Sequence, residues 1–171
     1  MKPSPLQRID IWVRQAAPIA LTLALVMISV VPTRLPGYSV VAPSLTLMSL
    51  FYWTVHRPDL LRVWAAFVIG LLEDSLSGTP LGVNALLYVL VHAAILAQYR
   101  VFRGKSFGLI WAAFALIAAF AQLMTAILAA VVGGTVIAAH VYAAQLILTI
   151  LLYPVVAWLM GRAQRAFLAT I

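Results

Sequence analysis

The segment that decides the fold is Gly70-Leu-Leu-Glu-Asp-Ser-Leu-Ser-Gly-Thr-Pro-Leu-Gly-Val-Asn84. It contains Glu73 and Asp74, which are two of the four acidic residues in the chain, and it contains three of the nine glycines. Long apolar runs with almost no charge flank it on both sides. Carboxylates are costly in contact with lipid, so acidic residues in such a setting usually face protein or water. The segment therefore predicts a polar turn between two membrane helices.

The composition around this segment is that of an integral membrane protein. The 171 residues are 65% hydrophobic and only 9% charged, whereas soluble domains are about half apolar and about a quarter charged. We predict a single membrane domain over residues 1–171, because no polar stretch is long enough for a second domain. The absence of cysteine excludes disulfides, thiolate metal sites and thiol nucleophiles.

The apolar runs predict an all-α, polytopic helix bundle with about six transmembrane helices. The predicted spans are residues 16–31, 40–55, 60–76, 82–98, 107–132 and 136–160, after a cytoplasmic or interfacial lead at residues 1–15. The third apolar run stops at Leu72, well short of the roughly 20 residues that cross a bilayer. Its helix must continue through the acidic pair, or the segment is re-entrant. Pro154 predicts a kink in the last span.

The positive charges predict the orientation. If the N-terminus is cytoplasmic, ten of the eleven basic residues fall on the cytoplasmic side and only Arg34 lies outside. The five tryptophans independently fall near the cytoplasmic ends of their spans, as an interfacial belt would. The predicted topology has both termini in the cytoplasm. The net charge of +7 is explained by this asymmetry, and no basic stripe suggests nucleic-acid binding.

The acidic pair is predicted to lie in the outer half of the membrane. Glu73 follows Arg62 by about 17 Å of helix in a hydrocarbon core about 30 Å thick. Glu73 and Asp74 are adjacent on a helix and differ by about 100° in direction, so they do not form a catalytic dyad. Arg34 is the one basic residue predicted on the same side that could pair with either.

Asp74 is expected to cap the turn that follows it or to accept hydrogen bonds from its backbone N–H groups. The alternatives are a contact with a partner or ligand and a proton-carrying site. Gly78, Pro80 and Gly82 predict a tight hairpin, because proline fixes φ and glycine permits positive φ or close backbone contact. The side chain of Asn84 is expected to satisfy backbone groups at the tip.

Other polar and small residues are expected to join helices. Ala16, Ala20 and Ala24 form a small-residue face that would let another helix approach closely. His92 and His140 lack metal-site spacing, and hydrogen bonds to neighbouring helices are expected instead. The same is expected of the three glutamines in or near the spans, Gln98, Gln122 and Gln145. No catalytic, metal or cofactor signature is visible.

The sequence resembles the MreD family of bacterial rod shape-determining inner-membrane proteins. Pro43-Ser-Leu-Thr-Leu, Tyr52-Trp53 and Arg57-Pro58 resemble the second span and the first cytoplasmic turn of the family. The segments Gly70-Leu-Leu-Glu-Asp74, Gly78-Thr-Pro-Leu-Gly82 and Ala85-Leu86 resemble its most recognisable part.

The resemblance implies a non-enzymatic component of the cell-elongation complex that supports lateral peptidoglycan synthesis and rod shape. The implied partners are an MreC-like protein, an MreB-like actin filament, a RodA-like glycosyltransferase and a penicillin-binding transpeptidase, with a homo-oligomer left open. It also implies a fold similar to the substrate-binding S-components of energy-coupling-factor transporters. A small-molecule (vitamin) carrier subunit is therefore the alternative function, and an intramembrane enzyme that uses Asp74 and His140 is a third.

Overall fold

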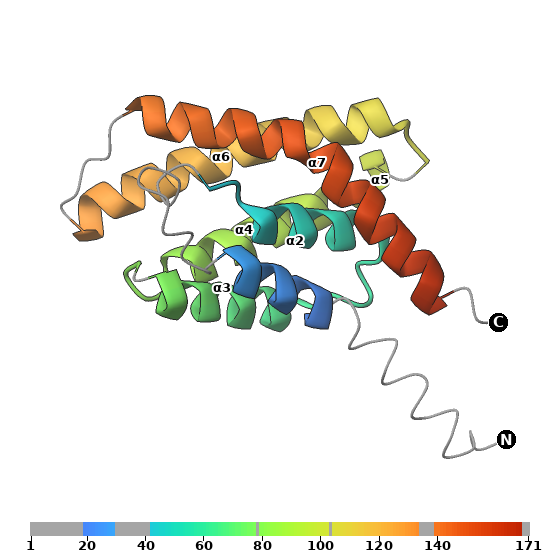
Figure 1. The fold of residues 1–171 in the computed structure, drawn as a ribbon, viewed down its shortest axis with the longest axis horizontal. Helices are drawn as coiled ribbons and strands as arrows, with labels where there is room; N and C mark the ends of the chain where they lie inside the picture. The colour runs from blue at the N-terminus through green and yellow to red at the C-terminus, as the bar shows by residue number, and fades with distance from the viewer. Residues whose placement is uncertain (1–18, 30–41, 78, 103, 134–138, 169–171) are drawn as a thin grey trace, which may run out of the picture.

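The computed structural model describes residues 19–29, 42–77, 79–102, 104–133 and 139–168, and every regular element within these ranges is a helix (Figure 1). The helices are Ile19–Ser29, which we call the N-terminal helix, α2 (Leu45–His56), α3 (Val63–Ser77), α4 (Val83–Ala97), α5 (Tyr99–Phe102), α6 (Phe107–Gly133) and α7 (Ala139–Leu168). The all-α prediction is confirmed for this part of the chain.

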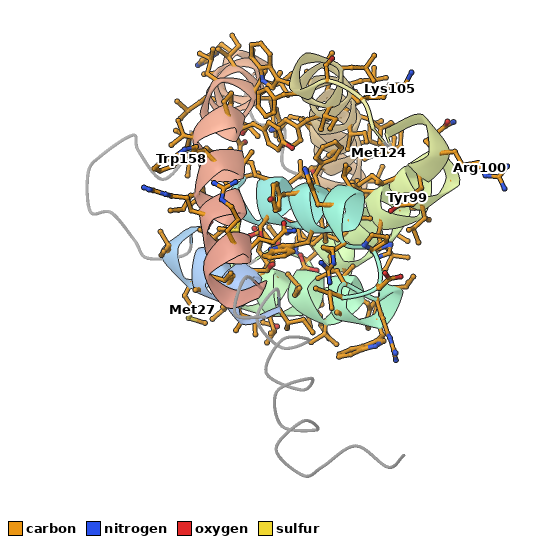
Figure 2. The ribbon with its side chains drawn as sticks, turned by 90° about the vertical axis from the view of Figure 1, so that its right-hand side faces the viewer. Met27, Tyr99, Arg100, Lys105, Met124 and Trp158 are labelled. Atoms are coloured by element: carbon orange, nitrogen blue, oxygen red, sulfur yellow. The ribbon has the colours of Figure 1, made fainter. Side chains whose placement is uncertain are left out.

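Helix α2 forms the centre of the bundle. All residues from Thr46 to Val55 are buried, and the end-on view shows the other long helices arranged around it (Figure 2). Phe51 packs edge-on against Phe114 of α6 and Tyr153 of α7, with ring centroids 5.2 and 5.7 Å away. A helix that is surrounded by helices needs apolar residues on all sides, and α2 meets this requirement without facing lipid.

Helices α3 and α4 form an antiparallel hairpin whose backbones touch. A Cβ atom built on Gly70 would lie 2.5 Å from the Cα atom of Ala85 and 2.6 Å from its backbone nitrogen. No real Cβ atom tolerates such distances, so only glycine fits this position. Gly70 therefore sets the separation of the two helices.

Among the described residues, α6 and α7 are the two helices that are long and apolar enough to cross a membrane, over Phe107–Leu128 and His140–Arg165. The distal end of α6 extends beyond the turn between α3 and α4 (Figure 1). Large apolar side chains cover the outer surfaces of both helices, among them Leu116, Leu123, Val131 and Leu151. Such surfaces suit contact with lipid.

Helix α7 bends in its middle, where Pro154 lies inside the helix (Figure 1). Proline has no N–H to donate, so the carbonyl four residues earlier loses its helical partner. That carbonyl belongs to Ile150, and it accepts a hydrogen bond of 2.9 Å from the indole Nε1 of Trp111 on α6. A side chain of the neighbouring helix thus replaces the bond that proline removes.

The helices follow the predicted apolar segments, with two corrections in the second half of the chain. Helix α3 runs without a break through the acidic pair to Ser77, past the end of the apolar run at Leu72. Residues 99–102 form a short helix where a turn was expected. Helix α7 continues to Leu168, well past the predicted end at residue 160, so Arg162 and Arg165 are helical.

The described tryptophans lie near the basic end of the bundle and differ in exposure. Trp64, Trp111 and Trp158 are exposed on the outside of the bundle, as an interfacial belt requires. Trp53 is buried, because it lies on the central helix α2. Trp12 lies outside the described residues.

All six basic residues of the described part lie at one end of the bundle. They border the C-terminal ends of α2, α4 and α7 and the N-terminal ends of α3 and α6, and they are Arg57, Arg62, Arg100, Lys105, Arg162 and Arg165. Figure 2 looks onto this end, where Arg100 and Lys105 project away from the helices. The turn between α3 and α4 lies at the opposite end (Figure 1).

Candidate functional site

Asp74 is the centre of the polar turn between α3 and α4. Its side chain is only 1% exposed. One carboxylate oxygen, Oδ1, accepts hydrogen bonds from Thr79 Oγ1 at 2.8 Å and from the Asn84 backbone N–H at 3.1 Å. The other, Oδ2, accepts bonds from the backbone N–H groups of Gly82 at 2.9 Å and Ala85 at 3.4 Å. Four donors therefore surround the buried charge.

These contacts place Asp74 at the N-terminus of α4. The first N–H groups of a helix have no partner within it, and a side chain just before the helix usually accepts from them. Here the N-cap residue is Gly82, with φ +100°, and it has no side chain to do so. The preceding helix supplies the acceptor instead, and the negative carboxylate faces the positive end of the α4 dipole.

Gly70 and Asp74 act on the same contact between the helices. They are four residues apart and therefore lie on one face of α3, and both are buried. The missing side chain of Gly70 lets Ala85 approach, and the approach brings the Ala85 N–H within reach of Asp74. Gly70 was not among the predicted site residues. Its position four residues before Asp74, on the same face of a helix, could have indicated it.

Glu73 faces a different set of partners from Asp74. Its Oε2 atom accepts a hydrogen bond of 2.6 Å from the hydroxyl of Tyr88 on α4. The hydroxyls of Ser44 and Thr46, where α2 begins, lie beside this pair. Thr46 is fully buried, so its hydroxyl faces Glu73 and Tyr88 away from the surface of the bundle. Asp74 thus binds the turn before α4, whereas Glu73 contacts Tyr88 and the start of α2. The two carboxylates do not share a site.

A chain of polar contacts continues from the start of α2 to α6 and α7. The Ser44 N–H donates to Thr149 Oγ1 at 3.2 Å. Gln145 donates through Nε2 to the Ala42 carbonyl at 2.9 Å and accepts at Oε1 from Gln122 Nε2 at 2.8 Å. The prediction that glutamines join neighbouring helices is confirmed for Gln122 and Gln145. The exposed Gln98 lies just after α4.

The two histidines have different roles. His92 is buried, and its Nε2 lies 2.6 Å from the Leu61 carbonyl, so it ties α4 to the connection between α2 and α3. His140 is exposed at the beginning of α7. Within the described residues, no group of three or more His, Asp or Glu side chains is placed to hold a metal ion.

The remaining residues of the predicted turn surround Asp74. Asn84 donates through Nδ2 to Thr79 Oγ1 at 3.4 Å, so it supports the hydroxyl that binds Asp74. Pro80 lies half-buried within the turn, where its carbonyl accepts from the Val83 N–H at 3.3 Å. Gly78 lies outside the described residues, as does Arg34.

The predicted alanine face points away from the bundle. Ala20 and Ala24 are exposed, and Ala16 lies outside the described residues. The N-terminal helix packs on α2 through its opposite face, where Thr22 and Ser49 share a hydrogen bond of 2.8 Å. Thr22 was not singled out from the sequence, because one threonine in an apolar run gives no directional signal.

A scan of family models matches residues 12–163 to the family described as rod shape-determining protein MreD. This range includes the α3–α4 turn and nearly all described helices. No solved structure matches the chain, so the expected similarity to transporter S-components finds no support. The family match covers most of the sequence, and we conclude that this chain belongs to the MreD family of rod shape-determining membrane proteins.

Proposed function

We propose that this protein is a non-enzymatic membrane component of the bacterial elongation complex, where it supports lateral peptidoglycan synthesis through contacts with other proteins. The family match over residues 12–163 carries this proposal. The geometry of the turn supports it, because all four hydrogen bonds of the Asp74 carboxylate go to groups of the same turn. That carboxylate organises a helix junction and has no free position for a substrate.

The proposed partners are an MreC-like protein, an MreB-like filament, a RodA-like glycosyltransferase and a penicillin-binding transpeptidase. Two surfaces are available for membrane partners. One is the outer face of the N-terminal helix with Ala20 and Ala24, where small side chains permit close helix contact. The other is the apolar exterior of the α3–α4 hairpin, which includes Leu72, Leu76 and Leu86.

Depletion of the protein in a rod-shaped host tests the proposed function. We expect depleted cells to become round and to lose insertion of new wall material along their sides, while the full chain expressed in trans restores both. Affinity purification from native membranes should recover the proposed partners. Depleted cells that remain rods, with wall synthesis unchanged, would overturn the proposal.

We further propose that the protein lies in the inner membrane with six crossing segments and with both termini in the cytoplasm. The gathering of the described basic residues at one end supports this orientation, because cytoplasmic ends carry the excess of Lys and Arg. In this arrangement the Asp74 turn lies toward the periplasm. The distal end of α6 extends beyond this turn (Figure 1).

Cysteine labelling tests the orientation cleanly, because the chain has no cysteine of its own. Ser77 and Ser106 are both exposed and lie at opposite ends of the bundle. We expect Ser77→Cys to react with a membrane-impermeant maleimide in cells with a permeabilised outer membrane. Ser106→Cys should react only after the inner membrane is opened. The reverse pattern would invert the proposed topology.

A further inference from the structure

Glu73 is an acidic residue without a lysine or arginine partner among the described residues. Its Oε2 atom accepts a hydrogen bond from Tyr88, Thr46 lies beside it, and Asp74 is the next residue in the chain. All Lys and Arg residues of the described ranges lie at the other end of the bundle. A carboxylate inside a membrane is normally paired with a basic group or with several donors.

The depth of Glu73 places it within the hydrocarbon region. Helix α3 has 15 residues, so it is about 22 Å long and shorter than a hydrocarbon core of about 30 Å. Glu73 lies four residues before its end at Ser77, about 6 Å below the turn. Aqueous cations are scarce at this depth, so a basic group must be delivered by protein.

Glu73 also lies at the edge of the buried face of α3. The position four residues earlier, Ile69, is buried, whereas Leu76 and Ser77, three and four residues later, are exposed. Glu73 itself is half-buried. The exposed part of Glu73 therefore borders an outer surface of the bundle that Leu72 and Leu76 make apolar.

Hydroxyl groups of α2 and α4 line the inner side of Glu73. Tyr88 donates to its Oε2 atom at 2.6 Å, and the hydroxyl of Thr46, which is 0% exposed, lies beside both residues. Each hydroxyl has a single proton to donate, whereas an ionised carboxylate has about four acceptor sites. An ammonium or guanidinium group with several N–H donors suits the remaining acceptor sites.

We propose that Glu73 binds a lysine or arginine side chain carried by a membrane-embedded helix of a partner protein that packs against Leu72 and Leu76. This inference rests on the proposed function, because it requires a membrane partner. The partner helix supplies the cation and also covers the exposed leucines. Phospholipid cannot fill both roles, because its acyl chains carry no positive charge and its headgroups lie above this depth.

Cross-linking in native membranes tests the contact. Leu76→Cys provides a unique thiol three residues from Glu73, because the chain has no cysteine. Leu151→Cys on α7 is the control, since Leu151 is also an exposed leucine. With a short maleimide that carries a photoactivatable group, we expect Leu76→Cys to capture one protein with a Lys or Arg in a membrane segment. Adding Glu73→Gln should lower the cross-linked yield at least about tenfold, because a buried charge pair loses one partner. Leu151→Cys should not capture it.

A charge exchange and an internal control complete the test. Glu73→Lys combined with an acidic residue at the partner's basic position should restore the cross-link. Arg34→Gln tests whether Glu73 pairs instead with Arg34 of its own chain. We expect this variant to leave the cross-linked yield unchanged. Two outcomes would overturn the inference and leave the proposed function standing. One is an equal cross-linked yield with and without Glu73→Gln. The other is loss of the cross-link in Arg34→Gln. If affinity purification of the wild-type chain recovers no membrane partner, both the inference and the proposed function are overturned.

Discussion

Asp74 shows how one residue can determine the junction of two helices. Its carboxylate satisfies three backbone N–H groups at the start of α4 and the hydroxyl of Thr79. The sequence allowed a role in the turn to be predicted, because an aspartate before a Gly/Pro segment is a common acceptor for backbone groups. It did not allow the reach to Ala85, eleven residues later, to be predicted. That contact depends on the distance between two backbones, which only the packed hairpin defines.

Asp74→Asn should destabilise the protein by about 3 kcal/mol. The amide has a single acceptor oxygen, and its NH₂ group would face donors, so buried N–H groups at the start of α4 lose their partner. Unfolding in detergent, followed by tryptophan fluorescence, measures the change. Ser75→Ala is the control, since Ser75 is exposed and bonds only to the Leu71 carbonyl of its own helix; we expect an effect below about 0.5 kcal/mol. Equal stability of both variants would contradict this role for Asp74.

Gly70→Ala should also be destabilising, by about 1–3 kcal/mol, because the added methyl group overlaps the Ala85 backbone and forces the helices apart. The matched control is Gly108→Ala on α6, where nothing lies within 4 Å of the added carbon. There the better helix propensity of alanine should leave stability unchanged or raise it by up to about 1 kcal/mol. If Gly70→Ala unfolds at the wild-type temperature, the close contact is not needed for stability.

The helices as elements were largely predictable, but their places in the bundle were not. Apolar runs and their Gly and Pro boundaries predicted the segments that became α3, α4 and α6 to within a few residues. The same reasoning could not separate α2 from the lipid-facing helices, because a helix inside a bundle and a helix in lipid are both apolar on all sides. The kink at Pro154 was predicted, whereas the contact of Trp111 with Ile150 required the register between α6 and α7.

Trp111 and Pro154 should depend on each other. Trp111→Phe keeps the aromatic ring but removes the Nε1–H, so the Ile150 carbonyl loses its donor, at a cost of about 1–2 kcal/mol. In a Pro154→Ala background the helix can supply its own N–H to that carbonyl, and the same Trp111→Phe change should cost far less. A double-mutant cycle of unfolding free energies measures the coupling. Additive effects would show that the indole bond does not compensate for the proline.

At the scale of the whole molecule, the distribution of charge was predictable and the packing order was not. The basic residues could be assigned to one end by counting apolar segments, and the described part of the bundle has them there. The spacing of the alanines predicted a face that another helix could approach; Ala20 and Ala24 are exposed, and the N-terminal helix packs on α2 through Thr22. Which face turns inward depends on helices that follow much later in the chain.

The central position of α2 has a consequence for biogenesis. The backbone groups just before and at its start are bonded to α7, in the contacts between Gln145 and Ala42 and between Thr149 and Ser44, which join residues 103 and 105 positions apart. Synthesis of some 100 residues takes about 5–20 s. During that interval α2 has left the ribosome while its polar partners do not yet exist. The nascent chain must therefore hold α2 at an interface or within the insertion machinery, and the core closes only when the last helix arrives.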